Sequence, residues 1–189
     1  MNKKYLIGGG IIAFTIASVI LIVRKMGYSN VATAINSAMG NYFTIAELCA
    51  STTAKQKGID NTPTASVKAN LQTLINKLLN PIREVYGKPI VVSSGYRCPA
   101  LNKAVGGVAN SQHTTGEAVD IQPTSTGSMK ALFEACAKIG GYDQLIIEHT
   151  DKAKWIHVSY SSTGKQRGQM MYYNGSYRNI TLAEAGKYL

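Results

Sequence analysis

The sequence predicts an α+β domain in which helices pack on one side of an antiparallel sheet, with one transmembrane helix before it. Three observations support this class. Apolar residues recur at helical spacing between residues 66 and 86. Several short runs with strand-like alternation follow residue 89, and only one helical pattern interrupts them. The chain also begins with a long uncharged apolar run.

The apolar run covers residues 5–23, which contain no charged side chain. Nineteen residues in a helix span about 28 Å, close to the thickness of a bilayer core. Polar positions at helical spacing, which a helix on the surface of a soluble domain would show, are almost absent. We therefore expect a transmembrane anchor or uncleaved signal in residues 1–25. Basic residues flank both ends of the run, so the charge rule does not fix its orientation.

The rest of the chain divides into a linker and a domain. Residues 26–41 are small and polar and are interpreted as a linker, which leaves residues 42–189 for the globular domain. Thr44 and Glu47 have the spacing of a capping box and predict a short helix. The longer helical pattern contains Pro81, which we expect to kink or split it. The remaining predicted elements are a helix at 128–139 and strands at 89–94, 117–122, 143–148 and 155–160, followed by a hairpin around Asn174-Gly175.

Composition limits the possible partners. The 189 residues carry a net charge of +10, and the basic residues are scattered along the chain. Scattered positive charge suits adhesion to an anionic polymer or surface, whereas nucleic-acid binding requires a clustered basic face, so no nucleic-acid partner is expected. Of the three cysteines, Cys136 falls on the apolar face of its helix and is expected to be a buried thiol. Cys49 and Cys98 could pair in an exported domain.

Two histidines and an aspartate could form a metal site. His113 and Asp120 are seven residues apart, which on one helix would separate them by about 10 Å along the axis. Zinc ligands must approach much more closely, because their bonds are only about 2.0–2.2 Å long. A reversal at 114–116 followed by a returning strand would bring the two together. His157, between the apolar Ile156 and Val158, would project from a sheet face and add a third ligand.

Several motifs in order carry a family resemblance. They read Ser94-Gly95-Tyr96-Arg97, Asn102 with Gly106-Gly107, Ser111-x-His113-x-x-Gly116-x-Ala118-x-Asp120, and Trp155-x-His157-Val158. The stretch from about 41 to 162 resembles peptidase family M15, which includes zinc D-Ala-D-Ala carboxypeptidases and phage endolysins. The resemblance implies a Zn²⁺ site on the open sheet face with His113, Asp120 and His157 as ligands. It also implies substrate binding by Arg97 and Ser111, and hydrolysis of peptide bonds in peptidoglycan.

The sequence departs from the family pattern at the positions of the catalytic general base. Some members carry an acidic residue three positions before the last histidine, and others a histidine two before it; these positions are Lys154 and Trp155 here. If residues 143–148 and 155–160 form a hairpin, Glu148 faces Trp155, diagonal to His157 at about 7–8 Å. Glu148 is therefore the predicted catalytic base. Asp143 and Glu117 are weaker candidates, and His149 could assist.

Two functions remain open from the sequence. The first is a zinc metallopeptidase, of carboxypeptidase or endopeptidase type, that cuts peptidoglycan stem or cross-link peptides during wall remodelling or phage lysis. The alternative is a non-catalytic zinc domain that binds wall peptides or a protein partner, motivated by the missing base positions. The expected location is a membrane, reached through residues 5–23, with the domain facing the cell wall or periplasm, or a phage particle.

Overall fold

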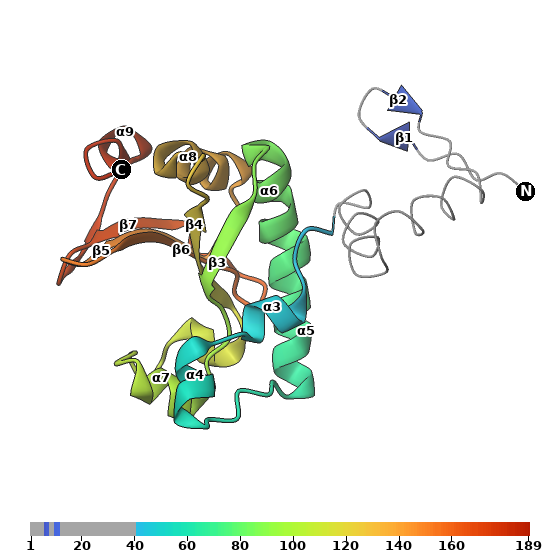
Figure 1. Cartoon of the computed structure of the whole chain (residues 1–189). Coiled ribbons are helices and arrows are strands. Elements are labelled where there is room, and N and C mark those ends of the chain that lie inside the picture. Colours follow the sequence, from blue (N-terminus) through green and yellow to red (C-terminus); the bar gives the residue numbers. More distant parts are fainter. Residues whose placement is uncertain (1–5, 8–9, 12–40) are drawn as a thin grey trace, which may run out of the picture. The chain divides into compact units, whose positions relative to one another are not determined.

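The computed structural model describes residues 6–7, 10–11 and 41–189 (Figure 1). The chain forms two units, residues 1–41 and 42–189, which are treated separately. In the first unit, the two-residue strands Leu6–Ile7 (β1) and Gly10–Ile11 (β2) pair in antiparallel fashion. The second unit contains every other element described here.

Five helices of the second unit begin after a Ser or Thr whose side chain accepts a backbone N–H group. Thr44, Ser51, Thr64, Ser128 and Thr181 each accept the N–H three residues ahead. The predicted short helix after Thr44 and the predicted helix after Ser128 are both confirmed. The α-helices are Ile45–Cys49 (α3), Thr52–Lys57 (α4), Ala65–Leu74 (α5), Asn80–Tyr86 (α6), Pro99–Ala104 (α7), Met129–Ile139 (α8) and Leu182–Ala185 (α9).

Pro81 does not break the long helical stretch. A five-residue π-helical segment, Ile75–Leu79 (η1), joins α5 to α6 and ends two residues before the proline. A proline removes one backbone donor and crowds the preceding turn, and a wider local helix can accommodate both effects. The apolar face therefore continues through the irregularity, and Leu74, Leu78 and Ile82 are all buried.

Six strands form one sheet in the order β3-β4-β6-β5-β7-β8. One face of the sheet is apolar and belongs to the core, together with α5, η1, α6 and α8 (Figure 1). On that face Val119, Ile121, Ile147, Ile156 and Val158 are completely buried. The strands are Ile90–Ser94 (β3), Ala118–Pro123 (β4), Gln144–His149 (β5), Lys154–Ser159 (β6), Gln169–Tyr173 (β7) and Tyr177–Asn179 (β8).

The prediction of an antiparallel sheet is wrong for one pairing, because the sheet is mixed. β7 pairs with β5 in parallel fashion, with Ile146 opposite Met171 and Glu148 opposite Tyr173. β6 returns the chain to the end of the sheet where β5 begins, and residues 160–168 cross at that end to the free edge of β5. β7 therefore starts beside the start of β5 and runs in the same direction. Alternation of apolar residues has the same period in both kinds of pairing and could not distinguish them.

The predicted transmembrane helix is also not found. No helix in the described part of the chain is long and apolar enough to cross a membrane. Within residues 5–23 the described residues are those of β1 and β2, which are strands, and the remainder of the run lies outside the described residues. Cys49 and Cys98, which could have paired in an exported domain, are free thiols. Cys136 is a buried thiol, as predicted.

Candidate metal centre

His113 lies in a tight turn between α7 and β4. The turn is a 3₁₀ segment, Gln112–Thr115 (η2), and the Ser111 hydroxyl oxygen accepts the His113 N–H at 3.4 Å. Gly116 ends the segment with φ of 75°, a left-handed conformation that suits glycine. The predicted reversal at 114–116 is therefore confirmed, and β4 carries the chain back past His113 toward Asp120.

A close backbone contact fixes the orientation of the His113 ring. The His113 Nδ1 atom lies 2.7 Å from the Gly95 carbonyl oxygen, which can only accept a hydrogen bond. Nδ1 must therefore carry the proton in the neutral ring, and Nε2 is left with a lone pair. A Cβ at Gly95 would lie 2.1 Å from the Leu48 carbonyl oxygen, so only glycine permits this approach of the β3 end to α3.

Asp120 and His157 occupy facing positions on neighbouring strands. They are direct partners in the β4–β6 register, and Ile146 faces His157 on the other side of β6. Facing residues share one side of a sheet, so both side chains leave the face opposite the core. Ile156 and Val158 on either side of His157 are completely buried, as the sequence predicted.

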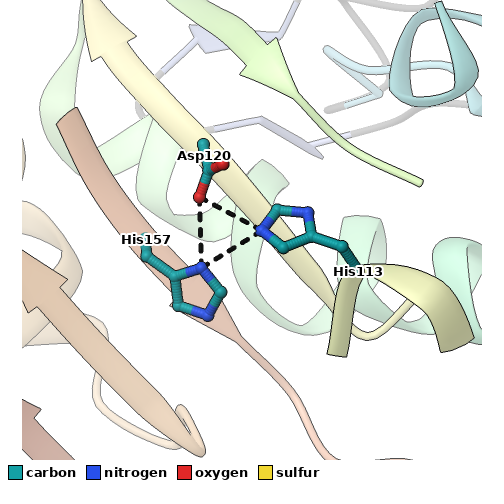
Figure 2. Close-up of side chains that lie close together, drawn as sticks. All are labelled: His113, Asp120 and His157. Carbon is teal, nitrogen blue, oxygen red and sulfur yellow. Dashed lines mark hydrogen bonds and ion pairs between the residues drawn. The ribbon is translucent and has the colours of Figure 1, made fainter. Parts of the chain in front are cut away.

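The three side chains converge on one point (Figure 2). His113 Nε2 lies 3.2 Å from Asp120 Oδ1 and 3.2 Å from His157 Nδ1, and the His157 Nδ1 to Asp120 Oδ1 distance is 3.1 Å. Bonds of about 2.0–2.1 Å in a tetrahedral site place ligand atoms about 3.3–3.4 Å apart, so the triangle has nearly the dimensions that zinc requires. The structure therefore brings together the three residues that the sequence selected, as a group able to hold a metal ion.

The protonation of these groups also fits a cation. His113 Nε2 and Asp120 Oδ1 are both acceptors when the His113 proton lies on the Gly95 side, so no hydrogen bond joins them. Two buried lone pairs at 3.2 Å repel unless a positive charge lies between them. A metal ion satisfies both atoms and the free Nδ1 lone pair of His157, provided that this ring is protonated on its other nitrogen.

Arg97 contacts the outer side of the Asp120 carboxylate. Its guanidinium Nη2 lies 3.2 Å from Asp120 Oδ2, which leaves Oδ1 for the histidines. Burial opposes ionisation of Asp120, but without a metal protonated His113 and His157 rings would donate to this carboxylate, and their charges and hydrogen bonds outweigh burial and hold the pKa of Asp120 well below its usual range. The Arg97 Nε–H is buried and has no hydrogen-bond partner among the described residues. The structure thus gives Arg97 a role in orienting a ligand in addition to the predicted role in substrate binding.

Glu148 lies where the hairpin argument predicted. Glu148 faces Trp155, and Ile146 faces His157, in the β5–β6 register. Burial raises the pKa of the Glu148 carboxyl group above its ordinary value, while the nearby charge of His157 lowers it and that of Asp120 raises it. The register also places Glu148 on the same face of the sheet as His157, on the neighbouring strand and diagonal to it. The Trp155 indole N–H also favours ionised Glu148, although it makes no hydrogen bond of regular geometry in the described part of the chain.

The other candidates for the general base are less suitable, because Asp143 and Glu117 already accept hydrogen bonds and His149 is exposed. Asp143 is buried and accepts hydrogen bonds from the Arg167 Nε and from Gln112 Nε2, the latter at 3.0 Å. Glu117 accepts from the Thr115 hydroxyl at 2.7 Å and from the Ser162 backbone N–H at 2.6 Å. His149 is at the exposed end of β5. Glu148 is therefore the best placed of the four.

Sequence reasoning missed two supports of the site. The Gly95 carbonyl belongs to a recognised motif, but a backbone acceptor leaves no trace in residue type. The Arg167–Asp143–Gln112 network holds the residue before His113, and nothing in the spacing of these three residues indicates it.

A cleft runs from the centre toward β3. Its volume is about 900 Å³, and Arg97 and Asp120 line its inner end. Hydroxyl side chains of α4 and β3, together with Lys55, line much of the remainder. Of the metal-binding group, Asp120 thus borders a cleft whose lining is partly polar and partly apolar.

Comparison with known proteins agrees with this geometry. No curated protein matches the chain significantly. The sequence model of the family described as Peptidase M15 matches residues 41–159, which contain the three converging residues, Arg97 and Glu148. The match covers well over half of the chain, and it ends with β6. The chain belongs to peptidase family M15.

Proposed function

We propose that this chain is a zinc-dependent peptidase that cleaves peptide bonds in peptidoglycan stem or cross-link peptides. The observation that carries the proposal is the triangle of His113 Nε2, Asp120 Oδ1 and His157 Nδ1, which has the size and the donor atoms of a three-residue zinc site. Three protein ligands are typical of catalytic zinc, because they leave a coordination position for chemistry. When bound, zinc polarises a carbonyl group and acidifies water.

The residues of the chain supply the other parts of the reaction. Glu148 takes a proton from the attacking water and passes it to the leaving amine, for which a partly buried carboxylate of raised pKa is suited. Arg97 keeps the outer oxygen of Asp120 occupied, and its remaining donors can hold a substrate carboxylate. Ser111 uses its hydroxyl oxygen to support the His113 turn, so its hydroxyl proton is free to bind a substrate carbonyl.

The net charge supports a wall polymer as the substrate. A chain of +10 is attracted to the anionic polymers of bacterial envelopes, and the cleft beside Arg97 also contains Lys55. Because peptidoglycan lies outside the cytoplasmic membrane, we propose that the chain acts there. The position of Arg97 beside the metal-binding group favours substrates whose free carboxyl end lies close to the scissile bond, as in a carboxypeptidase.

Digestion of purified muropeptides by the full chain tests the proposal. Products are identified by mass spectrometry after incubation with zinc, with a chelator, and with zinc restored after chelation. We expect new peptide fragments that disappear with the chelator and return with zinc, and a His157→Ala chain that produces none. A wild-type chain that binds one zinc but releases no product from any muropeptide would favour the alternative of a non-catalytic wall-binding domain.

A further inference from the structure

The face that carries the metal-binding group extends over strands that the family match does not reach. Residues 160–189 follow the matched segment and add β7 and β8 to the sheet beside β5. Tyr173 faces Glu148 across the parallel β5–β7 pair, and Tyr177 faces Tyr173 across the β7–β8 hairpin. Facing residues project from the same side of a sheet, so both tyrosines lie on the face of Glu148 and His157.

The two rings form a partly exposed aromatic surface. Their centroids are 4.5 Å apart with an interplanar angle of 40°, and Tyr177 is 57% exposed. Burial raises the pKa of Tyr177, and the charges of Glu148 and Asp120 raise it further, which agrees with its position on the site face. The neighbouring Arg178 points to the opposite face, where it stacks over Tyr172 and Tyr188. No cation therefore covers the Tyr173–Tyr177 surface from its own strand.

Distances along the sheet relate this surface to the metal-binding group. Tyr173 is two strands from His157 and Tyr177 is three strands away, with both displaced by two residues along the strand. Strand spacings of about 4.8 Å and a rise of about 3.3 Å per residue give separations of about 12 and 16 Å. An extended peptide covers that distance in about four residues.

The direction of the substrate follows from Arg97. Arg97 lies at the β3–β4 side of the metal-binding group, and the tyrosines lie beyond β5 on the other side. If Arg97 holds the carboxyl end of a stem peptide, the amino-terminal end crosses Glu148 toward β7 and β8. In peptidoglycan the amino terminus of the stem peptide is attached to a sugar, and in a five-residue stem cut before its last residue this sugar lies about four residues from the scissile bond.

We propose that Tyr173 and Tyr177 form a subsite for a sugar ring of the glycan strand to which the stem peptide is attached. A flat aromatic face packs against the C–H face of a pyranose, and a phenol hydroxyl can hydrogen-bond its polar substituents. The proposal rests on the proposed function, and it adds that the enzyme distinguishes glycan-linked stems from free peptides. A cross-strand tyrosine pair that only stabilised the hairpin would make no such distinction.

Kinetics on paired substrates test the subsite. The zinc-loaded full chain is given a stem pentapeptide and the same pentapeptide linked to its disaccharide, and wild type is compared with Tyr177→Ala and Tyr177→Phe. We expect Tyr177→Ala to lower kcat/KM about tenfold on the glycan-linked substrate, through KM, and to leave the free peptide unchanged. Tyr177→Phe should keep most of the preference, because the ring face remains. Equal losses on both substrates, or no loss on either, would overturn the proposal.

Two controls separate the subsite from hairpin stability and from the proposed function. Arg178→Ala alters the same strand on its other face, and it should leave the preference between the two substrates intact. Direct binding of the disaccharide N-acetylglucosaminyl-N-acetylmuramic acid to the full chain is followed by NMR of the tyrosine rings, which does not depend on hydrolysis. Ring shifts that are lost in Tyr177→Ala support the subsite even if no peptide is cut, whereas absent or unaltered binding refutes it.

Discussion

Replacement of Glu148 by glutamine is the sharpest test of the chemical assignment. The change keeps the size of the side chain and one carbonyl oxygen but removes the ability to accept a proton. Because burial raises the pKa of Glu148, the ionised group is costly to bury, and a neutral amide should not lower the melting temperature. Glu148 is not one of the converging metal-binding residues, so zinc content should remain at one per chain.

The expected loss is confined to the chemical step. A positioned general base contributes about 10²–10⁴-fold, which corresponds to about 2.7–5.5 kcal/mol of transition-state stabilisation. Turnover of a stem peptide should fall by that factor in single-turnover measurements, with little change in substrate binding. Glu117→Gln is a matched control, because the Glu117 carboxylate is occupied by Thr115 and Ser162 and should contribute little. Full activity in Glu148→Gln, with loss of activity in the control, would refute the assignment.

Three further predictions concern the groups around the base. His113→Ala should abolish stoichiometric zinc binding, measured by metal analysis after gel filtration, because Nε2 is one of only three converging donor atoms among the described residues; retention of one zinc per chain would disprove this role. Arg97→Lys keeps the charge but loses the planar fork, so we expect a higher KM with zinc retained, and an unchanged KM would remove Arg97 from substrate binding. Arg167→Ala should lower the free energy of unfolding by about 1–2 kcal/mol near pH 7, since half of the Arg167 side chain is exposed to solvent. The Arg167 hydrogen bonds hold the pKa of Asp143 below its ordinary value, so this difference from wild type should be complete above pH ~5 and shrink as the pH falls below ~4; urea titrations across pH measure it, and a pH-independent difference would contradict the ion pair.

The parts of the site predicted from sequence are those fixed by local pattern. The β5–β6 hairpin has a short connection, so the alternation of Ile147, Ile156 and Val158 leaves one register that buries all three, and that register places Glu148 opposite Trp155. The reversal of the chain between His113 and Asp120 was likewise predictable, because these two residues are close in sequence and could meet only across a turn. Gly116 permits that turn.

The parts that sequence could not supply depend on contacts between distant segments. Alternation does not reveal strand direction, so the parallel course of β7 beside β5 was missed. The Arg167–Asp143 ion pair joins residues 24 positions apart, and it holds β7 at the start of β5 together with the hydrogen bond from Gln169 N to Asp143 O. The N-terminal run was interpreted from its length, its lack of charge and its lack of polar periodicity, and its described residues form strands.

The proposed base, Glu148, lies beside one of the positions at which members of the family carry their base. Trp155 occupies the position two residues before the last histidine, where some members carry a functional histidine. Its partner across β5 and β6 is Glu148, and facing side chains on a sheet have Cβ atoms only about 4.5–5.5 Å apart. A carboxylate on the neighbouring strand can therefore approach the same region of the face as a group at position 155. Trp155 faces Glu148 across the β5–β6 pair, and burial raises the pKa of the Glu148 carboxyl group above its ordinary value, which makes the carboxylate a better proton acceptor than an exposed one.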